Sequence, residues 1–161
     1  MVLATLIFKL IIFLFSFTFS FSPQAQSIIG KAKIIDGDTI HIGKNKIRLH
    51  GIDAPEWNQS CSLSNKVWEC GKKSTLMLQE LIANQTVDCE ISGIDKYKRY
   101  IAVCFSNEVN LNKKMVQDGW AIAYRYYSKD YIKEEELARR NKVVIWTGKF
   151  LEPYQFRKKN K

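Results

Sequence analysis

The sequence is poor in histidine and proline, and it lacks several patterns that identify common classes of protein. It has 2 histidines, 3 prolines and 4 cysteines in 161 residues, and no two cysteines follow the Cys-x2-Cys spacing. Structural zinc sites use such closely spaced ligands, so a zinc-centred domain is disfavoured. The chain also has no internal repeat and no low-complexity tract, which is consistent with one compact domain.

Acidic residues are in the minority: 16 of them stand against 25 lysines and arginines, which gives a net charge of +9. Such a balance favours polyanionic partners, namely nucleic acid, an anionic membrane surface or an acidic polysaccharide. Apolar residues make up 46% of the chain, which is enough for a core and too much for general disorder. Charge alone does not choose among these partners, and a soluble protein can be basic without any of them.

Charge is nearly absent from the first 22 residues, where Lys9 is followed by an apolar run over residues 10–21. The run has the length of a signal-peptide core and is short for a membrane-spanning helix. We therefore expect residues 1–25 to be a signal peptide that directs export to a secreted or periplasmic location. An uncleaved membrane anchor formed by residues 1–22 is the alternative.

An even number of cysteines in an exported protein indicates disulfides, because the compartment is oxidising. The four are Cys61, Cys70, Cys89 and Cys104. They allow three connectivities, of which we favour Cys61–Cys70 and Cys89–Cys104. The first pair closes a short loop, and the second joins two predicted strands on either side of a turn. The second pairing also places Ile91 opposite Ala102, so that apolar residues face each other.

Alternation of apolar and polar residues predicts a β-rich domain with a few helices. The predicted strands cover residues 28–35, 39–42, 46–50, 86–91 and 99–105. The helical patterns cover residues 71–83, 110–118 and 131–142, the last with a solvated face at 134–136. We expect a mainly β domain of the α+β class, a small barrel packed by helices, over residues 26–152. Residues 153–161 are expected to be a basic, frayed C-terminal tail.

Two acidic residues lie on separate segments that a fold must bring together to make a site. Asp38 belongs to the turn Asp36-Gly37-Asp38-Thr39, and Asp53 begins the segment Asp53-Ala54-Pro55-Glu56. Taken alone, the first segment is explained by the turn that Asp-Gly sequences form, and we assign Asp36 to that turn or to a supporting position behind the cation ligands. Together, Asp38 and Asp53 are the kind of ligand that a hard cation such as Ca²⁺ prefers.

Two arginines accompany these acids. Arg48 lies in a predicted strand in which Ile47 and Leu49 point to the opposite side, and a solvated outer face is the simplest explanation of such an arginine. Beside two carboxylates, its planar and permanently charged guanidinium is also suited to clamp phosphate oxygens. Arg99 lies in the segment Asp95-Lys96-Tyr97-Lys98-Arg99. The set indicates a site for a cation and a phosphodiester.

The segments 36–40, 48–56 and 95–99, in this order, resemble the staphylococcal nuclease (thermonuclease) family, in its cysteine-bearing bacterial secreted type. The resemblance extends over about residues 28–146. It implies a five-stranded OB-fold barrel with three helices. It also implies a phosphodiesterase dependent on one Ca²⁺ ion, which hydrolyses DNA or RNA with little sequence specificity. The family attacks in line with water and leaves 3′-phosphate ends.

The resemblance also implies a role for each site residue. The matching acids, Asp38 and Asp53, bind Ca²⁺ together with a backbone carbonyl, here that of Ala54. The two arginines stabilise the pentacovalent transition state. Glu56 is the general base or the group that orients the attacking water.

A softer set of residues is expected to contact the substrate. By resemblance, Lys96 and Tyr97 contact the neighbouring phosphate and Tyr124 stacks on a base, with Tyr126 in the same set. Surface charge and barrel packing explain these residues equally well. Lys98 stands where the family usually has glycine, and lysine tolerates positive φ less readily, so we expect a reshaped turn.

The main alternative is a catalytically inactive OB-fold that only binds nucleic acid. Degenerate domains of that kind usually lack the arginines or the acids, whereas this chain retains both. No obligate protein partner is implied, and a monomer is the default expectation.

Overall fold

The computed structural model describes residues 26–160, so the predicted signal peptide or anchor in residues 1–25 lies outside the described residues. Within residues 26–160, no helix is long and apolar enough to cross a membrane.

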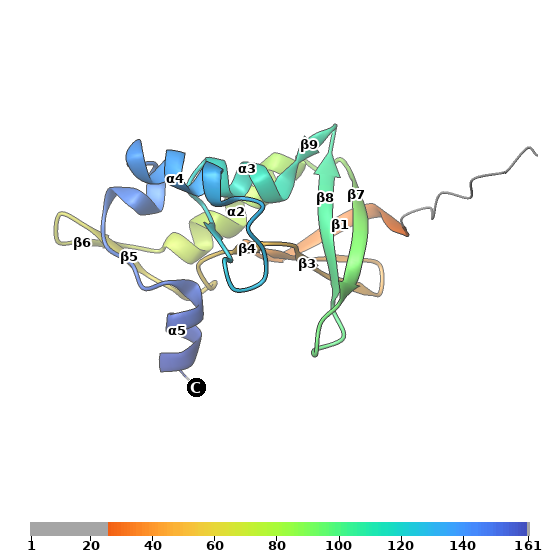
Figure 1. Cartoon of the computed structure of the whole chain (residues 1–161), viewed down its shortest axis with the longest axis horizontal. Helices are drawn as coiled ribbons and strands as arrows, with labels where there is room; N and C mark the ends of the chain where they lie inside the picture. Colours follow the sequence, from red (N-terminus) through yellow and green to blue (C-terminus); the bar gives the residue numbers. More distant parts are fainter. Residues whose placement is uncertain (1–25, 161) are drawn as a thin grey trace, which may run out of the picture.

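Five strands close into a barrel (Figure 1). They are β1 (Ser27–Asp36), β2 (Thr39–Ile42), β3 (Asn45–Leu49), β7 (Thr86–Ile94) and β8 (Tyr100–Ser106). Antiparallel pairing joins β1 to β2, β2 to β3, β1 to β7 and β7 to β8, and a parallel pairing of β3 with β8 closes the ring. Closure satisfies the strand edges that an open sheet would expose. The OB-fold predicted by resemblance is confirmed.

The alternating sequence pattern has its physical counterpart in the barrel core. Ile40, Ile47 and Leu49 point inward from β2 and β3 and are almost fully buried. Helices α2 (Cys70–Ile82), α3 (Leu111–Gln117) and α4 (Ile132–Arg140) lie to the left of β7 and β8 in Figure 1. Leu78 of α2 and Met115 of α3 pack into the same core cluster. The predicted helices therefore form, each with ends one or two residues from those expected.

Short elements connect the barrel to its helices. They are β4 (Ile52–Asp53), β5 (Cys61–Leu63), β6 (Lys66–Trp68), β9 (Val109–Asn110), β10 (Ile122–Ala123) and the 3₁₀ turn η1 (Val144–Thr147). Strand β4 pairs with β10, and this pairing fixes the segment that leads to Asp53.

Both favoured disulfides are present. Cys61–Cys70 ties the β5–β6 hairpin to the start of α2. Cys89–Cys104 joins directly opposed residues of β7 and β8, and the same register places Ile91 opposite Ala102, as predicted. Disulfides of this kind persist in oxidising compartments.

The C-terminal prediction was wrong. Residues Pro153–Lys159 form a further helix, α5, so four α-helices are described where three were expected. Proline is favoured in the first turn of a helix because it needs no N–H partner there. The three basic residues in the last turn interact favourably with the helix dipole. In Figure 1, α5 and the β7–β8 turn both reach the lower edge of the view.

The solvated helix face expected at residues 134–136 also needs correction. Glu135 is buried, and its carboxylate forms an ion pair with Arg125. Glu134 is half-buried and pairs with Lys113, and Glu136 is exposed, so the three glutamates of this run have three different environments.

Candidate active site

The turn between β1 and β2 carries Asp38 into the interior. Gly37 makes this possible, because a Cβ atom there would lie 2.1 Å from the hydroxyl oxygen of Ser74 and 2.7 Å from the Cβ of Ala54. The Asp38 carboxylate is buried and accepts hydrogen bonds from the Ala54 N–H and the Thr39 hydroxyl, each at 2.9 Å. The Asp38 side chain thus connects the first acidic segment to the second.

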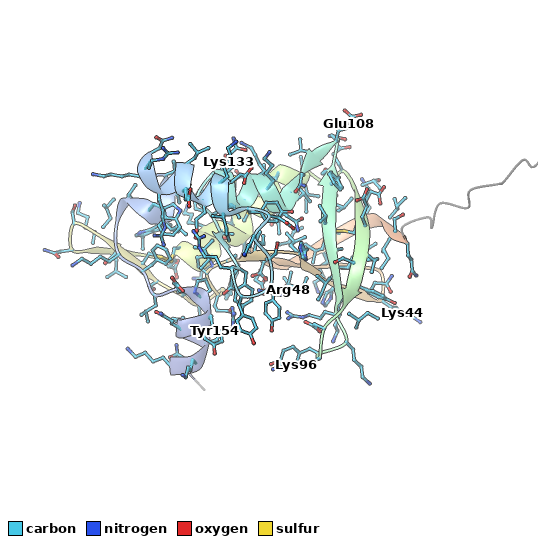
Figure 2. The ribbon with its side chains drawn as sticks, in the orientation of Figure 1. Lys44, Arg48, Lys96, Glu108, Lys133 and Tyr154 are labelled. Carbon is cyan, nitrogen blue, oxygen red and sulfur yellow. A yellow bond between two sulfur atoms is a disulfide. The ribbon has the colours of Figure 1, made fainter. Side chains whose placement is uncertain are left out.

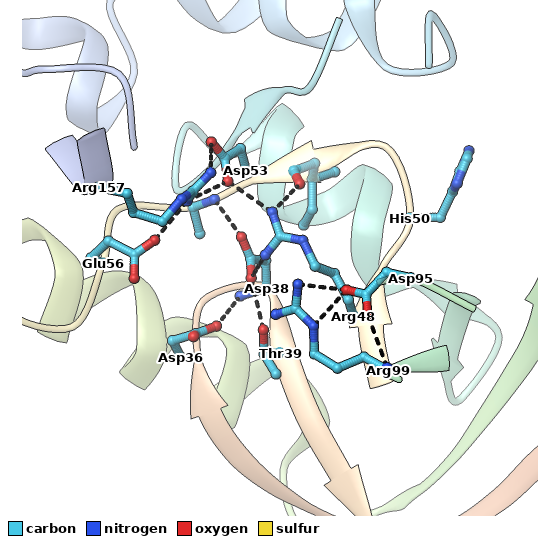
Figure 3. Close-up of polar contacts among 12 residues, drawn as sticks. Asp36, Asp38, Thr39, Arg48, His50, Asp53, Glu56, Asp95, Arg99 and Arg157 are labelled. Atoms are coloured by element: carbon cyan, nitrogen blue, oxygen red, sulfur yellow. Dashed lines mark hydrogen bonds and ion pairs between the residues drawn. The ribbon is translucent and has the colours of Figure 1, made fainter. Parts of the chain in front are cut away.

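Arg48 on β3 lies between the two predicted acids (Figure 3). Its guanidinium pairs with Asp38 and donates to Oδ1 of Asp53 at 2.8 Å and to the carbonyl of Ile52 at 3.3 Å. Burial alone would lower the pKa of Arg48, but the charges of Asp38 and Asp53 raise it, so the side chain stays protonated. The solvated outer-face alternative for this arginine is excluded.

The three aspartates of the cluster respond differently to burial. Burial and then the charge of Asp38 raise the pKa of Asp36 to about 7. Burial would also raise the pKa of Asp38, but the Arg48 charge and the Ala54 N–H hold it below its ordinary value. Burial and then the Asp38 charge raise the pKa of Asp53, against the guanidiniums of Arg157 and Arg48. Asp36 accepts from the Asp38 N–H at 3.1 Å, which agrees with its assignment to the turn.

Glu56 is positioned by the loop that follows β4. Its N–H donates to the side-chain oxygen of Gln59 at 3.2 Å, and its carbonyl accepts from the Gln59 N–H at 2.7 Å. Gly71 in α2 packs against the same peptide, since a Cβ atom there would lie 1.7 Å from the Glu56 carbonyl oxygen. The backbone of Glu56 is therefore fixed on two sides, and Gln59 is a supporting residue that the sequence did not reveal.

Arg157 of α5 is the residue of this site that the sequence analysis missed. Its guanidinium forms two bonds to Asp53, at 2.9 and 3.1 Å, and one to Oε1 of Glu56 at 2.6 Å (Figure 3). The available signal was modest: Pro153 at a possible helix start, followed by a short basic segment. No local sequence pattern predicts a contact between residues that are more than 100 positions apart.

Arg99 forms its ion pair with Asp95, which is not one of the carboxylates bonded to Arg48 and Arg157. Within residues 26–160, the ion pair of its guanidinium is with Asp95, at 2.7 Å. Asp95 also accepts from the backbone N–H groups of Tyr97 and Arg99, at 2.8 and 2.9 Å, and thereby organises the turn. Burial pushes the pKa of Asp95 upward, but the backbone and side-chain hydrogen bonds from Arg99 outweigh it and lower the pKa.

Lys98 lies in the turn in a backbone conformation that favours glycine. Its backbone adopts φ of 62°, the left-handed conformation that glycine would take, and its N–H donates to the Asp95 carbonyl at 2.9 Å. The turn is therefore closed by backbone bonds, and the lysine bears the conformational cost that glycine avoids.

The predicted substrate-contacting residues fall into two groups. Lys96 and Arg99 both approach the ring of Tyr97, at 5.1 and 5.5 Å from its centroid. Tyr124 lies beside the carboxylate cluster, with the Arg48 guanidinium 6.0 Å from its ring centroid, and Tyr126 is highly exposed. In the view of Figure 2, Lys96 and Tyr154 of α5 both lie below Arg48.

The carboxylates of this cluster are oxygen donors of the kind that a divalent cation takes. In the part of the chain that the structure describes, no group of three or more His, Cys, Asp or Glu side chains is arranged to hold a metal ion. Asp38 and Asp53, however, are close enough to share one guanidinium, and hard cations take carboxylate, carbonyl and water oxygens together. Three carboxylates meet two guanidiniums in the Asp38–Arg48–Asp53–Arg157–Glu56 network, which leaves one negative charge in excess. A cation held by Asp38 and Asp53 would therefore need carbonyl and water oxygens to complete its ligands.

Comparison with known proteins agrees with this chemistry. The family model described as "Staphylococcal nuclease homologue" matches residues 46–148. The matched residues include Arg48, Asp53, Glu56 and Arg99 and stop before α5.

Three curated relatives span most of the described chain. "Succinoglycan biosynthesis protein ExoI" of Rhizobium meliloti is 32% identical over 126 residues, which are 76% of this chain and 66% of that protein. "Uncharacterized endonuclease" of Haemophilus influenzae is 35% identical over 137 residues, or 80% of this chain and 72% of the relative. "Micrococcal nuclease" of Shigella flexneri is 31% identical over 147 residues, and the match covers 80% of this chain and 79% of the relative.

Proposed function

Because the chain belongs to the family of staphylococcal nuclease homologues and is a nuclease that acts on nucleic acid, we propose that it is a Ca²⁺-dependent phosphodiesterase. It hydrolyses DNA or RNA with little sequence preference and leaves 3′-phosphate ends. The observation that carries the proposal is the position of Arg48, joined at once to Asp38 and Asp53 in a buried cluster. Two buried acids and an arginine from three segments are not needed for barrel packing.

Each described residue has a task in this proposal. Asp38, Asp53 and the carbonyl of Ala54 would hold Ca²⁺, which when bound polarises a phosphoryl oxygen and offsets its charge. Glu56 orients or deprotonates a water for in-line attack on phosphorus. Arg48 and Arg99 donate to the phosphoryl oxygens as negative charge develops on them.

The remaining contacts concern the bound strand. Lys96 and Tyr97 contact the phosphate next to the one that is cleaved. Tyr124 and Tyr126 stack on bases, and stacking tolerates any base because every base has a π face. This tolerance supports low sequence specificity.

We also propose that the enzyme acts after export, as a monomer. The two disulfides support an oxidising location, in which they persist. A retained anchor in residues 1–22 would change the location and leave the chemistry of the site unaltered.

The test is cleavage of single-stranded DNA and of RNA by the purified, disulfide-intact protein in Ca²⁺ or in excess EGTA. Cleavage that requires Ca²⁺, yields 3′-phosphate ends and is lost in Glu56→Ala is expected. Glu80→Ala, on the exposed face of α2, is the matched control and should cleave normally. Tight binding of nucleic acid without cleavage in any divalent cation would identify the inactive binding module instead.

A further inference from the structure

The helix α5 is attached to the site by more than its own backbone. Gln59 is buried, and while its side-chain oxygen accepts from the Glu56 N–H, its side-chain nitrogen donates to the Leu151 carbonyl at 2.7 Å. One side chain therefore ties the Glu56 loop to the segment that enters α5. Pro153 at the start of the helix is buried as well. These contacts fix where α5 begins relative to Glu56.

From that anchored start, α5 presents Arg157 to two carboxylates. Asp53 is fully buried and receives the guanidinium through both of its oxygens. A bidentate arginine–carboxylate pair fixes the plane of the guanidinium as well as its distance. The third bond, to Oε1 of Glu56, is the shortest of the three at 2.6 Å. The buried aspartate orients the arginine, and the arginine in turn holds the glutamate.

The way in which Glu56 is held matches what its proposed role requires. Only Oε1 is bonded to Arg157, and Oε2 accepts no hydrogen bond from any residue between 26 and 160. The Glu56 side chain is partly exposed, so water can reach the second oxygen. A carboxylate with one oxygen clamped presents the other in a defined direction, and a misplacement of about 1 Å at such a group can cost on the order of 100-fold in rate.

The charge of the network also needs this arginine. With Arg157, three carboxylates meet two guanidiniums; without it, the same three would meet Arg48 alone. The charges of Asp53 and Glu56 raise the pKa of Arg157 even though burial opposes this, so its positive charge is permanent. Arg157 thus reduces repulsion among acids that must stay close together.

We propose that Arg157 is a positioning residue of the active site, which holds the Glu56 carboxylate in the direction required for attack by water. The inference rests on the proposed nuclease function, because it assigns Glu56 its role in that reaction. The C-terminal helix is then an integral part of the catalytic domain. The opposite arrangement, in which Arg157 obstructs the carboxylates and must leave before a cation binds, predicts the reverse behaviour on mutation.

The experiment compares Arg157→Ala, Arg157→Lys and Lys158→Ala in the full chain, with Glu56→Ala as the inactive reference. Lys158 is exposed on the same helix, so it controls for the loss of one positive charge. For Arg157→Ala we expect kcat to fall about 10- to 100-fold, the range typical of residues that orient an active group, with KM nearly unchanged. Arg157→Lys should recover part of the rate, and ethylguanidinium at non-denaturing concentrations should partly restore Arg157→Ala. Lys158→Ala should keep normal kcat.

Three results would overturn the proposal. Normal kcat in Arg157→Ala would make α5 a structural appendage, and a rise in KM alone would make Arg157 a contact for a distant phosphate. Higher activity, or tighter Ca²⁺ binding by titration calorimetry, would make it an obstruction. Thermal unfolding of each variant detects a folding defect, and rescue by ethylguanidinium distinguishes a missing guanidinium from a misfolded helix. If the unaltered protein cleaves nothing, the nuclease proposal itself fails, and that outcome is separate from these.

Discussion

The two arginines that the sequence singled out lie in regions of opposite character. Arg48 is largely buried on the side of β3 that faces away from the barrel core, and it bonds to Asp38 and Asp53, which come from two other segments. Arg99 lies at the β7–β8 turn and pairs with Asp95, only four residues earlier. The first region couples folding to the site, since breaking it leaves buried charges. The second is held by local bonds, so a change there should have little effect on the stability of the rest of the protein.

Replacing Arg48 with alanine should have the largest effect, because it disrupts both properties at once. Activity is expected to fall about 1,000-fold or more, as for charged clamps in phosphoryl transfer. The free energy of unfolding should fall by about 3 kcal/mol, since removing Arg48 leaves the buried Asp38 carboxylate without its ion pair. Cleavage assays and urea unfolding measure the two effects. A variant of normal stability would show that solvent reaches these acids.

Replacing Arg99 with alanine should separate the two properties. We expect a loss of rate of about 1,000-fold, as for Arg48, because the proposed phosphate contact disappears. The free energy of unfolding should change by less than about 1 kcal/mol, the usual worth of a partly exposed ion pair. The same two assays apply, with Lys98→Ala as a control that removes a charge from the same turn. Near-normal turnover in Arg99→Ala would remove Arg99 from the proposed clamp.

The buried region should also give stability an unusual dependence on pH. Asp36 has a pKa of about 7 in the folded protein against 3.8 when exposed. Between these values the folded state binds the extra proton, so stability should fall as pH rises from 4 to 7. The slope contributed by one such group is at most about 1.4 kcal/mol per pH unit.

Asp36→Asn tests this directly, because the amide oxygen can still accept from the Asp38 N–H. The variant should lose less stability than the parent as pH rises over that interval, as measured by thermal unfolding. Glu80→Gln, on the exposed face of α2, removes an acid outside the cluster and should follow the parent. Identical pH profiles for parent and Asp36→Asn would show that Asp36 titrates normally.

The smallest expected effect is at Lys98, in the locally held region. Its left-handed backbone costs an L-residue about 1 kcal/mol, which glycine avoids. Lys98→Gly should therefore raise the free energy of unfolding by up to about 1 kcal/mol and leave the cleavage rate nearly unchanged. Lys98→Ala removes the same charge and keeps a Cβ atom, so it should not gain stability. Equal stabilities for the glycine and alanine variants would mean that the turn relaxes.

Sequence alone determined what depends on neighbours along the chain. The alternation around Ile47 and Leu49 placed Arg48 on the opposite side of its strand, and the spacing of Cys89 and Cys104 gave both the disulfide and the strand register. Such patterns are legible because a strand repeats every two residues and a turn limits how its flanks can pair. The resemblance to a family then supplied the barrel topology, which pattern by itself could not.

Tertiary structure alone decided which distant groups meet. Arg157 reaches Asp53 and Glu56 across more than 100 residues, and Gln59 ties the Glu56 loop to Leu151. A basic C-terminal segment looks the same in sequence whether it frays in solvent or docks on buried acids. The difference depends on the shape and charge of the surface it meets, which exists only once the barrel has closed and buried Asp53.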